Sequence, residues 1–248
     1  MGNHYKEYGD KEGPLLLFIH GGGVGGWMWD KQVAYFMEYH CLVPTLQGHG
    51  ERSVESSFTV KSNAQEIIEL IEEHKRGRDV HLIGFSIGAQ IALEILSLAP
   101  TLVQSAIINS ALVLPMKMTS RFIAPSIKLT SFLIKNRAFS RIQAKELYID
   151  EHYFEQYYED SVNMRIDTLI AVLKENMAYD LPANIAESTA RILVTVGDKE
   201  KGMMKKSALK IAESHPNCSS IIISQVGHGF SFAQPERFNQ LVEEWLYK

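Results

Sequence analysis

A serine between two glycines is the strongest chemical signal in this 248-residue sequence. Gly84-Phe85-Ser86-Ile87-Gly88 stands between an apolar stretch typical of a strand and a helical pattern that begins at Ala89. A serine on such a strand–turn–helix is lifted above the sheet, and the flanking glycines avoid clashes as the chain reverses. Ser86 is therefore a candidate nucleophile. The Ile87 N–H, at a helix N-terminus, is a candidate donor to an oxyanion.

A serine hydroxyl needs an adjacent general base, and that base needs an orienting group. His228 follows the apolar stretch 219–226, while Asp198 and Glu200 follow the stretch 191–197. These positions fall at the carboxyl ends of expected parallel strands, where open α/β sheets place their sites. The chain order of serine, acid and histidine differs from the orders used by other triad folds. Either acid is a candidate partner of His228.

A glycine-rich turn, His20-Gly21-Gly22-Gly23, follows the first apolar stretch. Such a turn leaves backbone N–H groups free, so the Gly22 N–H could complete an oxyanion hole with Ile87. The alternative is a phosphate-binding loop, but the segment 21–26 fits G-x-G-x-x-G only loosely. No acidic residue ends the next expected strand, which finishes at Thr45, and a nucleotide site is therefore disfavoured.

Short apolar runs alternate with helical patterns along most of the chain. The expected strands are 15–20, 41–45, 79–85, 103–110, 191–197 and 219–226. Their nearly unbroken apolar character is typical of strands covered on both faces, as in a parallel sheet. Amphipathic spacing predicts helices around Ala64 to Ile71 and Phe238 to Trp245, with Pro235 in the first turn of the second. The fold class is therefore α/β, a doubly wound and mostly parallel sheet.

The alternation stops between Pro115 and Pro182. Helical patterns cover 123–135, 141–148 and 161–177, and no convincing strand appears. We interpret residues 115–182 as a helical cap inserted into a core domain formed by 1–114 and 183–248. Most of its aromatic residues are expected to pack the cap onto the core. They are Phe122, Phe132, Phe139, Tyr148, Tyr153, Phe154, Tyr157 and Tyr158.

Composition limits the function classes. The chain is 46% hydrophobic and 22% charged, and 25 basic residues nearly balance 29 acidic ones, so neither nucleic acid nor an anionic membrane is an expected partner. Cys41 and Cys218 show no metal-ligand or disulfide spacing. The N-terminus has no signal-peptide pattern, and no apolar run is long enough to span a bilayer. We expect a cytoplasmic protein without a metal or cofactor.

Taken together, these motifs resemble the α/β-hydrolase fold superfamily, in particular its capped esterases, C–C hydrolases and perhydrolases. The resemblance rests on the turn at 20–23 with Trp27, the loop 48–53, the Ser86 elbow, Gly197 to Glu200, and Gly227-His228. It implies that Ser86 is the nucleophile, His228 the base, Glu200 rather than Asp198 the acid, and Gly22 and Ile87 the oxyanion donors.

Two departures from the family pattern stand out. Thr45 occupies the place of a common Asp in the D-x-x-G-x-G loop, so a hydroxyl is expected where a carboxylate usually braces the loop. Glu200 stands where the family usually has Asp. His20 and His49 are expected to hydrogen-bond backbone and shape their loops rather than to react.

The resulting expectation is a serine hydrolase that cleaves a small or medium, uncharged ester. A serine at the elbow argues against haloalkane dehalogenation and epoxide hydrolysis, because the relatives with those activities use Asp there. Hydrolysis of a C–C bond in a ring-cleavage product remains an alternative, as does a triad-bearing ligand-binding or signalling protein. The expected partner is a small-molecule substrate, bound by a monomer or homodimer.

Overall fold

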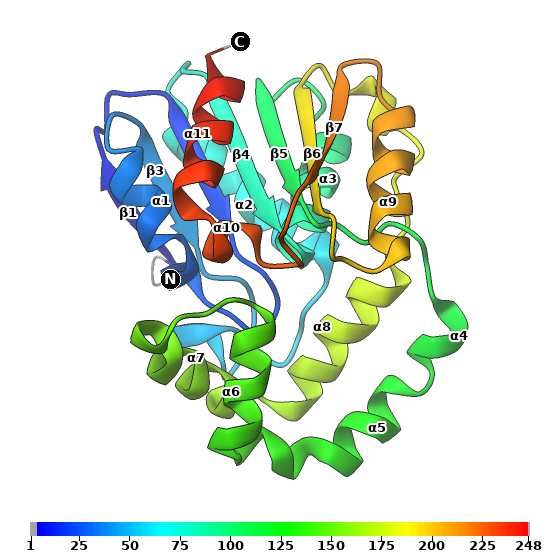
Figure 1. The fold of residues 1–248 in the computed structure, drawn as a ribbon. Coiled ribbons are helices and arrows are strands. Elements are labelled where there is room, and N and C mark those ends of the chain that lie inside the picture. The colour runs from blue at the N-terminus through cyan, green and yellow to red at the C-terminus, as the bar shows by residue number, and fades with distance from the viewer. Residues whose placement is uncertain (1–3, 248) are drawn as a thin grey trace.

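A seven-stranded sheet runs through the centre of the protein, with helices on both faces (Figure 1). The computed structural model describes residues 4–247, without the side chains of Lys117 and Thr119. The strand order is β1-β3-β2-β4-β5-β6-β7, in which β1 pairs antiparallel with β3 and all other neighbours pair in parallel. The α/β, mostly parallel sheet predicted from the sequence is therefore confirmed. The strands are β1 Tyr5–Gly9, β2 Leu15–Ile19, β3 His40–Pro44, β4 Val80–Phe85, β5 Ser105–Asn109, β6 Arg191–Gly197 and β7 Cys218–Ile223.

The helices divide between the sheet and a long insertion after β5. Those packed on the sheet or leading into the site loops are η1 Gly26–Trp29, α1 Asp30–Tyr35, η2 Gly50–Arg52, α2 Val60–His74, α3 Ile87–Leu98, η4 Ile185–Glu187, α9 Gly202–Glu213, α10 Phe230–Ala233 and α11 Pro235–Leu246. Those of the insertion are α4 Lys117–Ser120, α5 Ile123–Thr130, η3 Ser131–Lys135, α6 Arg137–Glu146, α7 Glu151–Asn163 and α8 Ile166–Ala178.

Alternate residues of the central strands pack into two separate apolar layers. In β2, Leu15, Leu17 and Ile19 join the layer formed with α2 and α3, whereas Leu16 and Phe18 join the layer formed with α1 and α11. All five residues are fully buried. Burial on both faces explains why the central strands have unbroken apolar sequences rather than alternating ones.

The two edge strands are the elements that the sequence predicted least well. No strand was expected at Tyr5–Gly9, which lacks an apolar run because much of β1 is exposed at the sheet edge. The last strand was expected over 219–226 and to be covered on both faces. It ends at Ile223 instead, and residues 219–222 are exposed, because β7 has a neighbour on one side only.

Helices α4 to α8 of the insertion lie together beyond the carboxyl ends of the parallel strands (Figure 1). The helical pattern predicted over 123–135 corresponds to α5 followed directly by the 3₁₀ helix η3. The prediction of a single helix over 161–177 is wrong, because α7 ends at Asn163 and α8 begins at Ile166. Of the aromatic residues expected to pack onto the core, Phe154 and Tyr157 are buried, but Phe122 and Phe132 are exposed. Within residues 4–247, no helix is long and apolar enough to cross a bilayer.

Candidate active site

Ser86 occupies a sharp turn between β4 and α3. Its backbone has φ +55° and ψ −116°, a conformation that non-glycine residues seldom adopt and that marks stored strain. The Ser86 N–H donates to the Asn109 carbonyl of β5 at 2.9 Å, which fixes the turn to the neighbouring strand. A Cβ on Gly84 would lie 2.4 Å from the Gly88 carbonyl oxygen, and one on Gly88 would lie 2.4 Å from that of His20. Both positions therefore require glycine.

Glu200 and His228 meet at the carboxyl ends of β6 and β7. A Glu200 carboxylate oxygen, Oε2, lies 2.8 Å from Nδ1 of His228. Its other oxygen accepts hydrogen bonds from the Gly197 N–H at 2.9 Å and from the Ser110 hydroxyl at 2.7 Å. The Glu200 side chain is only 2% exposed. Burial raises its pKa, but the hydrogen bonds from His228, Gly197 and Ser110 outweigh burial and leave the pKa of Glu200 below its usual value.

Asp198, the alternative acid, has a different role. Its carboxylate is exposed and accepts a hydrogen bond from the Val226 N–H at 3.2 Å, so it braces the loop that leads to His228. Of the two acids, the structure places Glu200 against His228.

The structure does not join His228 to the nucleophile by a hydrogen bond. Within the described residues the Ser86 hydroxyl makes none, although the His228 ring lies 4.9 Å from that of Phe85, the residue before Ser86. Contacts between a catalytic base and its nucleophile are often long without substrate and shorten in the complex. The structure thus brings the acid and the histidine together, beside the elbow.

Ser110 belongs to the site but was not identified from the sequence. It follows β5 with φ +58°, and its hydroxyl donates to Glu200. The only sequence signal was its place at the end of an expected strand, next to the elbow strand in the sheet. Because Ser110 and Glu200 are 90 positions apart, their contact follows from strand order, which the sequence did not specify.

Gly22 and Ile87, the residues predicted to supply the oxyanion donors, are neighbours in the structure. A Cβ built on Gly22 would stand 3.6 Å from Cγ2 of Ile87. Among residues 4–247, neither the Gly22 N–H nor the Ile87 N–H donates to a protein acceptor. The Gly23 N–H, by contrast, donates to Nε2 of His49 at 3.2 Å. Both amides therefore lack a protein acceptor in the part of the chain that the structure describes.

Two buried histidines hold the glycine turn, as predicted. His20 Nδ1–H donates to the Gly21 carbonyl at 2.8 Å, and its Nε2 accepts from the Leu46 N–H at 3.1 Å. His49 Nδ1–H donates to the Gln47 carbonyl at 3.0 Å while its Nε2 holds Gly23. Since each ring has one donor and one acceptor partner, both are neutral. Burial lowers the pKa of His20 to about 3 and that of His49 to about 4.

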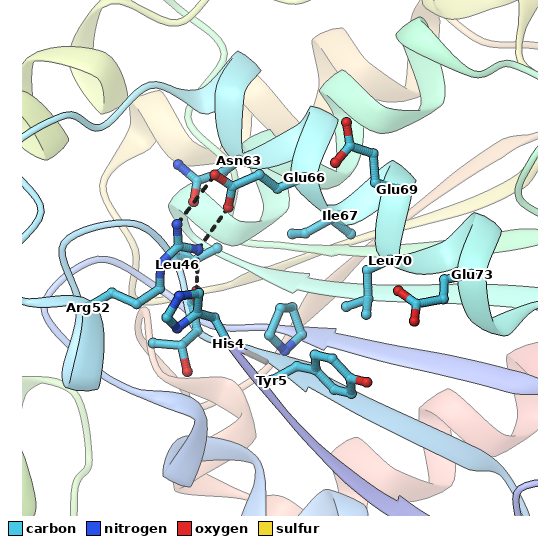
Figure 2. Close-up of a pocket in the computed structure, with 12 residues that line it drawn as sticks. His4, Tyr5, Leu46, Arg52, Asn63, Glu66, Ile67, Glu69, Leu70 and Glu73 are labelled. Carbon is cyan, nitrogen blue, oxygen red and sulfur yellow. Dashed lines mark hydrogen bonds and ion pairs between the residues drawn. The ribbon is translucent and has the colours of Figure 1, made fainter. Parts of the chain in front are cut away.

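The loop after β3 is braced by carboxylates, which corrects the expectation placed on Thr45. Arg52 donates to both Glu55 and Glu66, with N–O distances of 2.8 Å, and also to the Thr45 carbonyl at 3.1 Å. The Thr45 backbone, not its hydroxyl, takes part. Figure 2 shows Arg52 and Glu66 at one end of a groove of about 280 Å³ between the loop and α2. No proposed catalytic residue lines that groove.

Two cavities flank the site instead. One, of about 370 Å³, is lined by Gly22 and Gly23 and by insertion residues that include Leu147. The other, of about 520 Å³, is lined by Glu200 and His228 and again by Leu147. The insertion therefore forms a wall on both sides of the site. Cavities of this size suit a small or medium ligand.

Tyr148 ties the insertion to the histidine loop. It follows α6 with φ +60°, and its hydroxyl accepts a hydrogen bond from the Gly227 N–H at 2.9 Å. A Cβ on Gly229 would lie 2.3 Å from the Leu147 carbonyl oxygen, so the loop passes too close to the insertion for any other residue. From the sequence alone, Tyr148 was only one of several aromatic residues of the insertion.

A serine at a strained strand–helix turn and a buried acid–histidine pair, at the carboxyl ends of parallel strands, are the arrangement typical of α/β hydrolases. Residues 16–241 match the family model described as "Alpha/beta hydrolase family". The chain belongs to this family.

The chain is similar to a putative carbamate hydrolase, RutD, of Stutzerimonas stutzeri (strain A1501), with 23% identity over 98% of this chain and 96% of that protein. It is 24% identical to Lipase 1 of Psychrobacter immobilis, over 90% of this chain and 74% of the lipase. Its fold matches the crystal structure of a hydrolase from Pseudomonas aeruginosa PA01, with a TM-score of 0.83 and 19% identity over 98% and 93% of the two chains. The family and these relatives support hydrolase activity.

Proposed function

We propose that this protein is a carboxylesterase that acts by acyl transfer through Ser86, His228 and Glu200. The observation that carries the proposal is the buried Glu200 carboxylate, 2.8 Å from His228 Nδ1 and beside the Ser86 elbow. A carboxylate at Nδ1 keeps the ring proton there, so Nε2 stays free to accept a proton from the nucleophile.

In the proposed reaction, the Ser86 oxygen attacks the ester carbonyl carbon and His228 Nε2 takes the serine proton. The negative charge on the carbonyl oxygen is stabilised by the Gly22 and Ile87 amides. The tetrahedral intermediate collapses as His228 returns the proton to the alcohol that leaves. Water, deprotonated by His228, then attacks the acyl-enzyme and releases the acid and free Ser86.

The cavity walls support an uncharged substrate of modest size. Ile134, Leu147, Met164 and Leu169 supply apolar surface around Gly22. Glu146 is the one charged residue among the described residues that line this cavity, and it disfavours an anionic acyl group there by like-charge repulsion. In this proposal residues 115–182 act as a cap that selects the substrate.

A carbamate is the second candidate substrate. The Stutzerimonas relative, which matches nearly the whole chain, is named a putative carbamate hydrolase. A carbamate carbonyl would use the same nucleophile and the same amide donors, so the two substrates differ in the cavity rather than in the triad.

The test combines covalent labelling with turnover. A fluorophosphonate probe should label the native protein once, at Ser86, and Ser86→Ala should abolish both the label and the hydrolysis of short p-nitrophenyl esters. Dienoic diketones test the alternative of C–C bond hydrolysis in a ring-cleavage product. Labelling without turnover of esters, carbamates or these diketones would indicate a ligand-binding protein. A native protein that takes no label would refute the assignment of Ser86.

A further inference from the structure

Large apolar side chains are exposed along the outer edge of the insertion. Met118, Phe122, Leu129 and Phe132 are 80%, 68%, 77% and 70% exposed, respectively. The last three, with exposed Pro125 between them, are three or four positions apart along α5 and η3, so they share one helix face. We call Met118, Phe122, Leu129 and Phe132 the apolar stripe. Exposed apolar residues that gather on one face mark interaction sites, whereas residues scattered singly over the surface need no explanation.

The opposite face of the same segment is already packed. Ile123 is buried, Ile127 is half-buried, and α5 contacts α8, which lies between α5 and the sheet (Figure 1). The segment therefore has an apolar inner face that packs against the rest of the protein and an apolar outer face that is exposed to solvent.

The charged residues next to the stripe along the chain are of one sign. Residues 117–145 contain seven Lys or Arg and no Asp or Glu, in a chain that has four more acidic than basic residues overall. Arg137 and Arg141 are paired with glutamates of α7. Arg121, Lys128, Lys135 and Lys145 are exposed, and none of these four forms an ion pair with another described residue. The net charge of the whole chain is close to zero, and no membrane partner was expected for that reason. That total hides the local excess of basic residues over 117–145.

We propose that the apolar stripe and its basic flanks dock on the surface of an anionic lipid bilayer. Apolar side chains on one face of a helix, bordered by Lys and Arg, are the features of a helix that lies in the membrane interface. The basic flanks complement acidic headgroups. They oppose a second copy of this chain on the same face, because two such faces would place like charges together.

Docking would bring the membrane close to the proposed substrate cavity. Phe132 is exposed on η3, and Ile134, two residues later, lines the cavity beside Gly22. This proposal goes beyond the esterase activity and does not depend on it, since vesicle binding can be measured whether or not Ser86 reacts.

The test is flotation of the full chain with vesicles of phosphatidylcholine alone or with one-third phosphatidylglycerol. The protein should bind the anionic vesicles, and high salt should weaken that binding. Lys128→Gln with Lys135→Gln should lower the partition coefficient about 25-fold, at roughly fivefold per charge. Leu129→Ser with Phe132→Ser should lower it at least as much.

Two matched variants on α9 serve as controls, because Leu209 and Lys206 are also exposed but lie outside the stripe. Leu209→Ser and Lys206→Gln should bind like the native protein, and all variants should keep the native circular dichroism spectrum. Absence of binding to anionic vesicles, equal binding to neutral ones, or an equal loss in the α9 variants would overturn the proposal. So would a dimer in solution that the stripe variants dissociate, or capture of an acidic protein without any vesicle binding.

Discussion

Replacing the Glu200 carboxylate by an amide should nearly abolish hydrolysis without unfolding the protein. One Glu200 oxygen accepts from the Gly197 N–H, which can only donate, so the amide oxygen of Glu200→Gln must take that place. The amide NH₂ then faces His228 Nδ1. Since two donors cannot share that contact, Nδ1 must lose its proton and the ring proton moves to Nε2. His228 can then no longer accept a proton from Ser86.

The opposite amide orientation is disfavoured by the same contacts. Turning the NH₂ toward Gly197 would set two buried donors against each other, at a cost of about 1–3 kcal/mol. In serine protease triads, an acid-to-amide exchange that imposes the wrong histidine tautomer lowers kcat about 10⁴-fold. We therefore expect kcat/KM of Glu200→Gln to fall about 10³- to 10⁴-fold.

The assay is steady-state hydrolysis of a short p-nitrophenyl ester, together with the rate of fluorophosphonate labelling. Asp198→Asn is the matched control, because Asp198 is exposed, contacts the Val226 N–H and does not touch His228. It should stay within about threefold of the native rate, because the amide oxygen of Asp198→Asn can still accept from the Val226 N–H and the contact of Glu200 with His228 is unchanged. If Glu200→Gln keeps a tenth of the native activity, or if Asp198→Asn loses as much as Glu200→Gln, the assignment of the acid is wrong.

Three further outcomes are expected. Ser110→Ala should lower kcat about tenfold with KM unchanged, because it removes a hydrogen bond to a charged acceptor, whereas Ala at the buried Ser97 of α3 should change neither constant. Tyr148→Phe should lower kcat about fivefold by releasing the histidine loop from the insertion, and a change confined to KM would contradict this positioning role. Burial lowers the pKa of His49 to about 4, so its contribution to stability is complete above pH 6.5 and is lost as the pH falls toward 4. In urea unfolding at pH 7 and pH 5, His49→Gln should reduce the pH-dependent loss by about 2 kcal/mol, and Gln at the exposed His152 should not.

The site residues that are held by the sheet could be predicted from the sequence. Ser86 and Glu200 follow buried apolar strands, and His228 follows the edge strand β7, which also pairs in parallel, so the carboxyl ends of these strands lie on the same side of the sheet. The edge strands were harder to predict, because a strand with one neighbour need not be apolar on both faces. β1 was therefore missed, and the end of β7 was placed three residues too late.

The contacts that residues of the insertion make with the site could not be predicted in this way. The Tyr148 hydroxyl meets the Gly227 N–H across 79 positions, and neither residue type signals the other. Sequence spacing reports which face of a helix is apolar, but not whether another element covers it. That is why Phe154 and Phe132, both aromatic and both in the insertion, were given the same packing role, although one is buried and the other is 70% exposed.

Net charge has the same weakness as apolar spacing, because it sums over positions that the fold separates. A chain with 25 basic and 29 acidic residues was expected to have no electrostatic preference for a surface. Yet an interfacial surface responds to charges within about one Debye length, roughly 10 Å at 0.1 M salt. Only Lys and Arg that share a face with the apolar stripe count at that range. Salt-dependent binding that is lost on removing Lys128 and Lys135, but not Lys206, would show that local segregation, rather than the total, governs how this protein meets a membrane.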